Sequence, residues 1–136
     1  MAKNYRSELV GAFGCPIDEN PTGVMEEAAF AKCGLDFRYL TIKVNKGDLK
    51  AAMDGVRAFN MRGINLTIPH KVEVLKYLDE LSPAAEIIGA VNMVVNNNGK
   101  LWGENTYAIN TDSVHLIHCI TPLCNIRNKR ERNFLI

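Results

Sequence analysis

The sequence predicts an α/β fold: an open, mostly parallel sheet in three layers, with helices on both faces and a terminal antiparallel hairpin. Apolar runs with the two-residue period of strands alternate with stretches of helical period, which is typical of parallel sheets with right-handed crossovers. An Asn-Gly pair at Asn98-Gly99 separates two strand-like runs and indicates the hairpin. The length of 136 residues, with 47% hydrophobic and 23% charged residues, fits one globular domain.

The first part of the chain has the pattern of a β-α-β unit. Residues 9–14 are an apolar run ending in glycine, which predicts a buried strand followed by a loop at the carboxyl edge of the sheet. Asn20 and Pro21 have the form of a helix N-cap and a first helical residue, and Gly34 has the form of a C-terminal cap. Residues 37–44 alternate as a second strand, so a helix is expected between the two strands.

A second helix and a central strand are expected next. Asn45 and Asp48 resemble a capping box, and apolar residues recur after them at helical spacing. Residues 64–68 alternate as a strand, and Pro69 suits the first position of a helix because it lacks an N–H group. Residues 82–89 predict a short helix between a Ser-Pro start and a glycine end.

Composition excludes several classes of protein. A formal net charge of +1 gives no reason to expect nucleic acid or an anionic membrane as partner. Because no apolar run approaches the roughly 20 residues of a membrane span, and the polar first residues lack a signal-peptide core, a cytoplasmic location is expected. The four cysteines lack paired C-x-x-C spacing and are interpreted as reduced thiols. The His and Cys residues of the segment 115–124 fit no regular zinc pattern, so no metal is expected.

One segment carries a family resemblance. Residues 65–71, Asn-Leu-Thr-Ile-Pro-His-Lys, resemble the signature of shikimate dehydrogenases in their amino-terminal substrate-binding domain. Further matching segments follow the family order: Gly11–Pro16, Ala28–Phe30, Leu78–Leu81, Gly89–Asn92 and Gly103–Thr106. The resemblance covers roughly residues 8 to 106. It implies a substrate-binding domain over residues 1–106 and a divergent, helical or irregular tail over residues 107–136, with the NADP-binding domain of the family absent.

Lys71 would lie in the first turn of the helix that starts at Pro69. The helix dipole and unpaired N–H groups disfavour a cation there by about 0.3–1 kcal/mol, so stability alone would not select a lysine. Two interpretations are open: a solvated surface lysine, or a lysine in a cleft at the carboxyl end of a strand. The resemblance implies the second, with Lys71 as the catalytic lysine that works beside an aspartate on the substrate hydroxyl.

The position of that aspartate departs from the family. The family motif is Asn-Thr-Asp-Gly, whereas Asn105-Thr106 is followed here by Tyr107. A second Asn-Thr-Asp ends at Asp112, five residues later than the family position. Asp112 is a candidate catalytic residue only if the intervening residues loop out, and loss of the carboxylate is the alternative that we favour.

The resemblance also implies a substrate pocket made by Asn65, Thr67, Lys71 and Asn92. Amides and hydroxyls suit a small polyhydroxy acid, because each substrate hydroxyl needs a donor or acceptor when it is buried. The alternative is that these side chains only satisfy strand ends and a turn. For the substrate carboxylate the family uses Ser-x-Ser-Pro, and the matching side chains here are Asn20 and Thr22. Capping of the first helix is an equally open role for Asn20.

The sequence therefore predicts the substrate-binding domain of a shikimate dehydrogenase-like oxidoreductase. The family interconverts 3-dehydroshikimate and shikimate with NADP, in aromatic amino acid biosynthesis. The alternative is a truncated, non-catalytic module that binds a small polyhydroxy acid such as quinate or shikimate. No Gly-x-Gly-x-x-Gly turn is present in the 136 residues, so we expect this chain alone to be inactive. Shikimate or a quinate-like acid is the expected ligand, and the oligomeric state is open.

Overall fold

A computed structural model describes residues 4–108. The chain divides into two compact units, Met1–Asn105 and Thr106–Ile136, and the sheet with its covering helices belongs to the first. The strands are β1 (Glu8–Gly14), β2 (Phe37–Lys43), β3 (Gly63–Leu66), β4 (Glu80–Leu81), β5 (Met93–Asn97) and β6 (Lys100–Glu104). The helices are α1 (Thr22–Lys32), α2 (Leu49–Ala58), α3 (His70–Glu73) and α4 (Pro83–Ile88), with shorter 3₁₀ turns η1 (Lys46–Asp48), η2 (Val74–Tyr77) and η3 (Thr106–Ala108).

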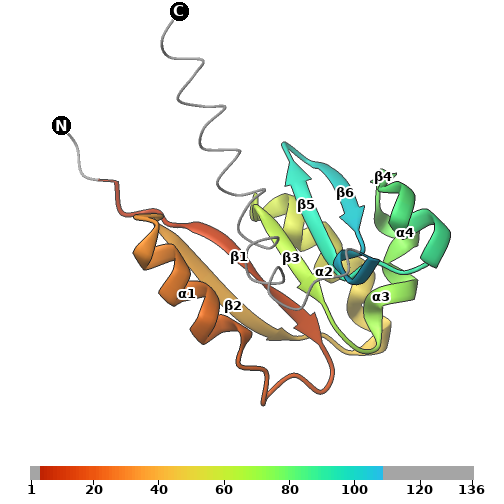
Figure 1. Cartoon of the computed structure of the whole chain (residues 1–136), viewed down its shortest axis with the longest axis horizontal. Helices are drawn as coiled ribbons and strands as arrows, with labels where there is room; N and C mark the ends of the chain where they lie inside the picture. Colours follow the sequence, from red (N-terminus) through yellow and green to blue (C-terminus); the bar gives the residue numbers. More distant parts are fainter. Residues whose placement is uncertain (1–3, 109–136) are drawn as a thin grey trace, which may run out of the picture. The chain divides into compact units, whose positions relative to one another are not determined.

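The six strands form one mixed sheet in the order β2-β1-β3-β5-β6-β4 (Figure 1). β1 pairs in parallel with β2 on one side and with β3 on the other. β5 is antiparallel to β3 and to β6, and β4 adds a short parallel pair with β6. The carboxyl ends of β1, β2 and β3 therefore meet at one edge of the sheet, which is where the predicted site residues follow in the sequence.

Both faces of the sheet are covered, as the alternation of strands and helices predicted. Leu9 and Phe13 of β1 pack into the main core with α2. Val10 and Ala12, which point the opposite way, are also buried but lie outside that core. α1 packs on this second face, along β2 (Figure 1).

The main core is held by the apolar face of α2. Leu49, Met53 and Val56 recur at helical spacing and are fully buried against Ile64 and Leu66 of β3. Burial of each such side chain contributes about 1.5–3 kcal/mol relative to exposure. This packing fixes β3, and with it the start of the segment that resembles the family signature.

A buried amide joins the core to the hairpin. Asn96 is 5% exposed, and its Nδ2 donates to the carbonyl of Met61 at 2.9 Å. Its Oδ1 accepts the N–H of Gly99 at 2.7 Å. Asn98 and Gly99 both have positive φ, 54° and 93°, as the predicted Asn-Gly turn requires.

Several predicted boundaries are confirmed and others are wrong. The short helix α4 begins as expected, with Ser82 Oγ accepting the N–H of Ala85 at 3.1 Å, and Gly89 ends it in the left-handed region. The predicted capping box does not form. Asn45 makes no side-chain cap, and its Nδ2 donates instead to the carboxylate of Asp48 at 3.2 Å.

The central strand is shorter than predicted. β3 ends at Leu66 rather than at residue 68, although the N–H of Thr67 still donates to the carbonyl of Phe13 in β1. The Thr67 carbonyl then accepts the N–H of His70, which closes a turn containing a cis Ile68-Pro69 peptide. Pro69 therefore precedes α3 instead of being its first residue.

Candidate functional site

Four of the predicted pocket residues lie on backbone segments that are hydrogen-bonded to one another. The N–H of Leu66, between Asn65 and Thr67, donates to the carbonyl of Asn92 at 2.8 Å. The carbonyl of Lys71 accepts the N–H of Val91 at 2.8 Å. The end of β3, the start of α3 and the segment before β5 are thus joined by main-chain bonds, and they carry Asn65, Thr67, Lys71 and Asn92.

The loop after β1 is attached to the same place. Thr67 donates its N–H to the Phe13 carbonyl at 3.0 Å, and Cys15 donates its own N–H to the Ile68 carbonyl at 2.9 Å. Gly14 lies between these two bonds. A Cβ at Gly14 would clash with Thr67 Cγ2 and would lie 3.3 Å from the Ile68 carbonyl oxygen. Only glycine lets the threonine approach β1 this closely.

The polar side chains of the site are half-buried rather than sequestered. Asn65, Thr67, Lys71 and Asn92 all have intermediate exposure. Groups of this kind remain accessible to a ligand and already lie in a partly dehydrated setting, where a hydroxyl without a partner costs about 1–3 kcal/mol. The arrangement suits recognition of a small ligand with several hydroxyl groups.

Asn20 and Thr22 lie at the start of α1. Asn20 Oδ1 accepts the N–H of Thr22 at 2.9 Å, but Asn20 is not the N-cap that the sequence suggested, and no side chain caps this helix start. α1 begins at Thr22 with Pro21 at its N-cap, one residue later than predicted. Asp112 lies outside the described residues.

Tyr39 connects this helix start to the pocket, and sequence reasoning missed it. Its ring lies on the α1 face of β2, where a Cβ at Gly23 would be 3.2 Å away. Its hydroxyl accepts a hydrogen bond from Asn65 Nδ2 at 3.0 Å. The side chain is only 8% exposed. The signal was present in the two-residue period of β2, which places Tyr39 and Thr41 on one face.

His70 is a second residue that the sequence analysis did not single out. Its side chain is fully buried, and Nε2 lies 2.7 Å from the carbonyl oxygen of Val44. Because a carbonyl only accepts, Nε2 carries a proton, and Nδ1 is buried with no partner among the described residues. The bond fixes the start of α3 to the end of β2, directly before Lys71.

The described part of the chain gives no sign of a metal site or a membrane span. Among residues 4–108, no group of three His, Cys, Asp or Glu side chains is placed to hold a metal ion. Within the same residues, no helix is long and apolar enough to cross a bilayer.

The family model described as shikimate dehydrogenase substrate binding domain matches residues 12–94. The chain belongs to this family. The shikimate dehydrogenase (NADP(+)) of Desulforamulus reducens is 47% identical over 103 residues, which are 76% of this chain and 35% of that protein. The chain spans about a third of the length of the curated relatives that it matches.

Solved structures of shikimate dehydrogenase type have the same fold. Shikimate 5-dehydrogenase from Listeria monocytogenes, solved with shikimate and NAD, is 48% identical with a TM-score of 0.71, over 72% of this chain and 34% of that one. A 5-ketofructose reductase of a Gluconobacter species is 44% identical with a TM-score of 0.75, over 76% of this chain and 37% of that one. The shikimate dehydrogenase fold thus occurs with enzymes named for different substrates.

Proposed function

We propose that residues 1–106 form the substrate-binding domain of an oxidoreductase of shikimate dehydrogenase type, followed by a divergent tail over residues 107–136. The observation that carries the proposal is the hydrogen-bonded frame that joins the segments of Asn65, Thr67, Lys71 and Asn92. A frame of main-chain bonds holds these side chains at fixed spacing before a ligand arrives, which lowers the entropic cost of binding. In the complete enzyme Lys71 would exchange a proton with the substrate hydroxyl.

The described residues do not fit a dinucleotide. A phosphate-cradling turn runs from a strand directly into a helix through several glycines. Here β1 is followed by Cys15, a cis Pro16 and five further positions before α1 begins. The relatives are named for NADP as cofactor. We assign this chain the binding of the substrate only.

The direct test is an amide NMR titration of the chain with shikimate and, separately, with NADPH. Shikimate should shift the amides around Thr67, Lys71 and Asn92 with a dissociation constant of about a millimolar, equivalent to roughly 4 kcal/mol. Lys71→Ala should weaken binding, whereas Lys76→Ala, an exposed lysine on η2, should not. Saturable NADPH binding, or shikimate shifts elsewhere only, would contradict the proposal.

A non-catalytic module is the second candidate, favoured by the loss of aspartate at Tyr107. Fusion of this chain to the cofactor domain of a relative separates the two functions. Turnover that Lys71→Ala abolishes would support the enzyme, whereas shikimate binding without turnover would support the module. If Asp112 supplies the carboxylate, Asp112→Ala will abolish turnover in the fusion and Tyr107→Asp will add none. If it does not, Tyr107→Asp will raise turnover.

A further inference from the structure

The loop before α1 differs from the carboxylate-binding loop that the family resemblance implies. Two serine hydroxyls are expected there, and this chain has Asn20 and Thr22 instead. Asn20 Oδ1 accepts the N–H of Thr22, at 2.9 Å. The N–H groups at a helix start are the ones that bind anions most readily. One of them is already taken by an oxygen of the protein itself.

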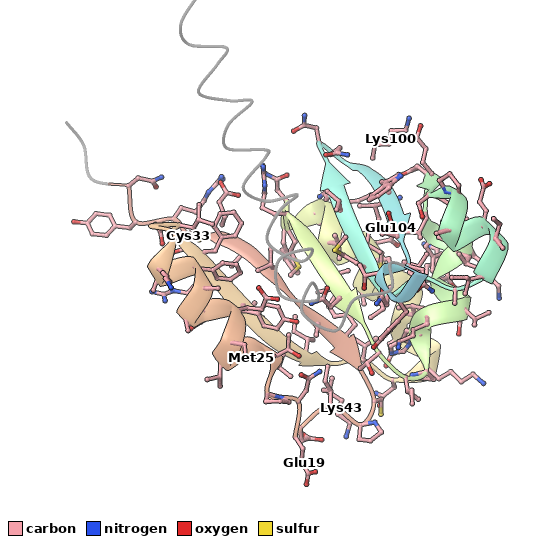
Figure 2. All side chains as sticks on the ribbon, viewed as in Figure 1. Glu19, Met25, Cys33, Lys43, Lys100 and Glu104 are labelled. Atoms are coloured by element: carbon pink, nitrogen blue, oxygen red, sulfur yellow. The ribbon has the colours of Figure 1, made fainter. Side chains whose placement is uncertain are left out.

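Charge around this loop is unfavourable for an anion. Residues 15–31 contain four acidic side chains and no lysine or arginine. Asp18 and Glu19 are exposed in the loop itself. Lys43, which pairs with Gly14 at the end of β2, is a cation at the same edge of the sheet (Figure 2). The loop itself therefore carries only negative charge, and each exposed carboxylate weakens the binding of a nearby anion by roughly twofold.

The groups that remain suit hydroxyls. Asn20 supplies a side-chain amide and Thr22 a hydroxyl. Asn65 supplies a second amide, whose Nδ2 donates a hydrogen bond to the hydroxyl of Tyr39. These neutral groups act as both donors and acceptors, which matches a hydroxyl or a carbonyl group better than a carboxylate, which only accepts. The one cation among the predicted pocket residues, Lys71, belongs to α3 and not to the loop before α1.

We propose that this pocket takes an uncharged polyhydroxy compound, a polyol or its ketone, with no carboxylate at the end facing Asn20 and Thr22. The proposal rests on the substrate-binding function proposed above and narrows its ligand class. It treats Asn20 and Thr22 as specificity-determining residues and Asp18 and Glu19 as the charges that disfavour an acid.

The test compares shikimate with its carboxamide, which has the same ring and hydroxyls but no charge. Both are titrated against the chain by amide NMR. The carboxamide should bind at least as tightly as shikimate. In an Asn20→Ser/Thr22→Ser variant, the preference should move toward shikimate by about tenfold, because two hydroxyls and the released N–H become donors to the carboxylate.

A second pair of variants isolates the charge. Asp18→Asn/Glu19→Gln should strengthen shikimate binding about two- to fourfold and leave the carboxamide unchanged. Glu86→Gln removes one exposed carboxylate on α4, away from the loop, and should change neither ligand. The amide spectrum of each variant verifies that it is folded.

Three results would overturn the inference. Shikimate binding ten times tighter than the carboxamide in the unaltered chain is the first. Loss of shikimate binding in Lys43→Gln is the second, since it would show that this lysine holds a carboxylate. Failure of both ligands to bind is the third, and it alone would also refute the proposed function.

Discussion

Gly14→Ala is expected to damage the pocket through a single methyl group. The new Cβ would clash with Thr67 Cγ2 and would lie 3.3 Å from both the Ile68 carbonyl oxygen and Ile17 Cδ1. Optimal carbon–carbon contacts are about 3.5–4.0 Å, so the threonine must move. Overpacking of this kind costs about 1–3 kcal/mol, offset by about 0.5–1 kcal/mol from the lower entropy of the unfolded alanine chain.

The net loss is thus about 1–2 kcal/mol of unfolding free energy, or a melting temperature lower by roughly 5–15 °C for a domain of this size. Shikimate binding should weaken by at least about tenfold, because Thr67 is displaced. Thermal denaturation followed by circular dichroism, together with the NMR titration, measures both. Gly47→Ala is the matched control, since no atom lies within 4 Å of its added Cβ.

A double variant tests whether Thr67 Cγ2 is the group with which the new methyl clashes. Thr67→Ser removes the clashing Cγ2 and keeps the hydroxyl, so Gly14→Ala/Thr67→Ser should recover stability and binding beyond the sum of the single changes. Additive effects would show that the threonine methyl is not the contact that matters. Normal shikimate binding by Gly14→Ala alone would remove Thr67 from the pocket.

Three further predictions concern Asn96, Asp79 and His70. Asn96→Ala should lower the unfolding free energy by about 2–4 kcal/mol in urea titration, because it leaves buried backbone groups without partners. The pKa of Asp79 is lowered, chiefly by the hydrogen bond from the Leu101 N–H. Its contribution to stability is therefore present above pH 3.8, the ordinary value, and is lost as pH falls through the lower folded pKa. Asp79→Asn should flatten the acid limb of the urea midpoint. His70 should carry a proton on Nε2 in ¹⁵N NMR, and an unprotonated Nε2 would contradict its bond to the Val44 carbonyl.

Local patterns in the sequence predicted the elements of the fold well. The continuous apolar run of β1 reports burial on both faces, and the spacing of Leu49, Met53 and Val56 reports burial on one side of a helix, which is why these two elements were predicted. The Asn-Gly turn and the Ser-Pro start of α4 carry their own backbone requirements. Such signals depend on a few adjacent residues, so these elements can be predicted from the sequence alone.

What the sequence missed depends on contacts between distant segments. Tyr39 and His70 were missed because each acts through a partner more than 25 residues away. The end of β3 was misplaced because the alternating pattern of residues 64–68 runs on past Leu66, whereas the chain turns there and the Thr67 carbonyl accepts the N–H of His70. The pocket residues came from family resemblance, which carries long-range information that a single sequence lacks, and they stay a prediction.

The frame beneath the pocket also bears on how such a domain changes its ligand over evolution. The bonds among Phe13, Thr67, Leu66 and Asn92 use main-chain atoms, so they survive when a pocket side chain is exchanged. If the loop before α1 selects the ligand as we propose, mutation there will alter what is recognised without disturbing where it is held. Ligand selectivity can therefore change with little effect on folding, so related proteins with the same fold can come to bind different ligands.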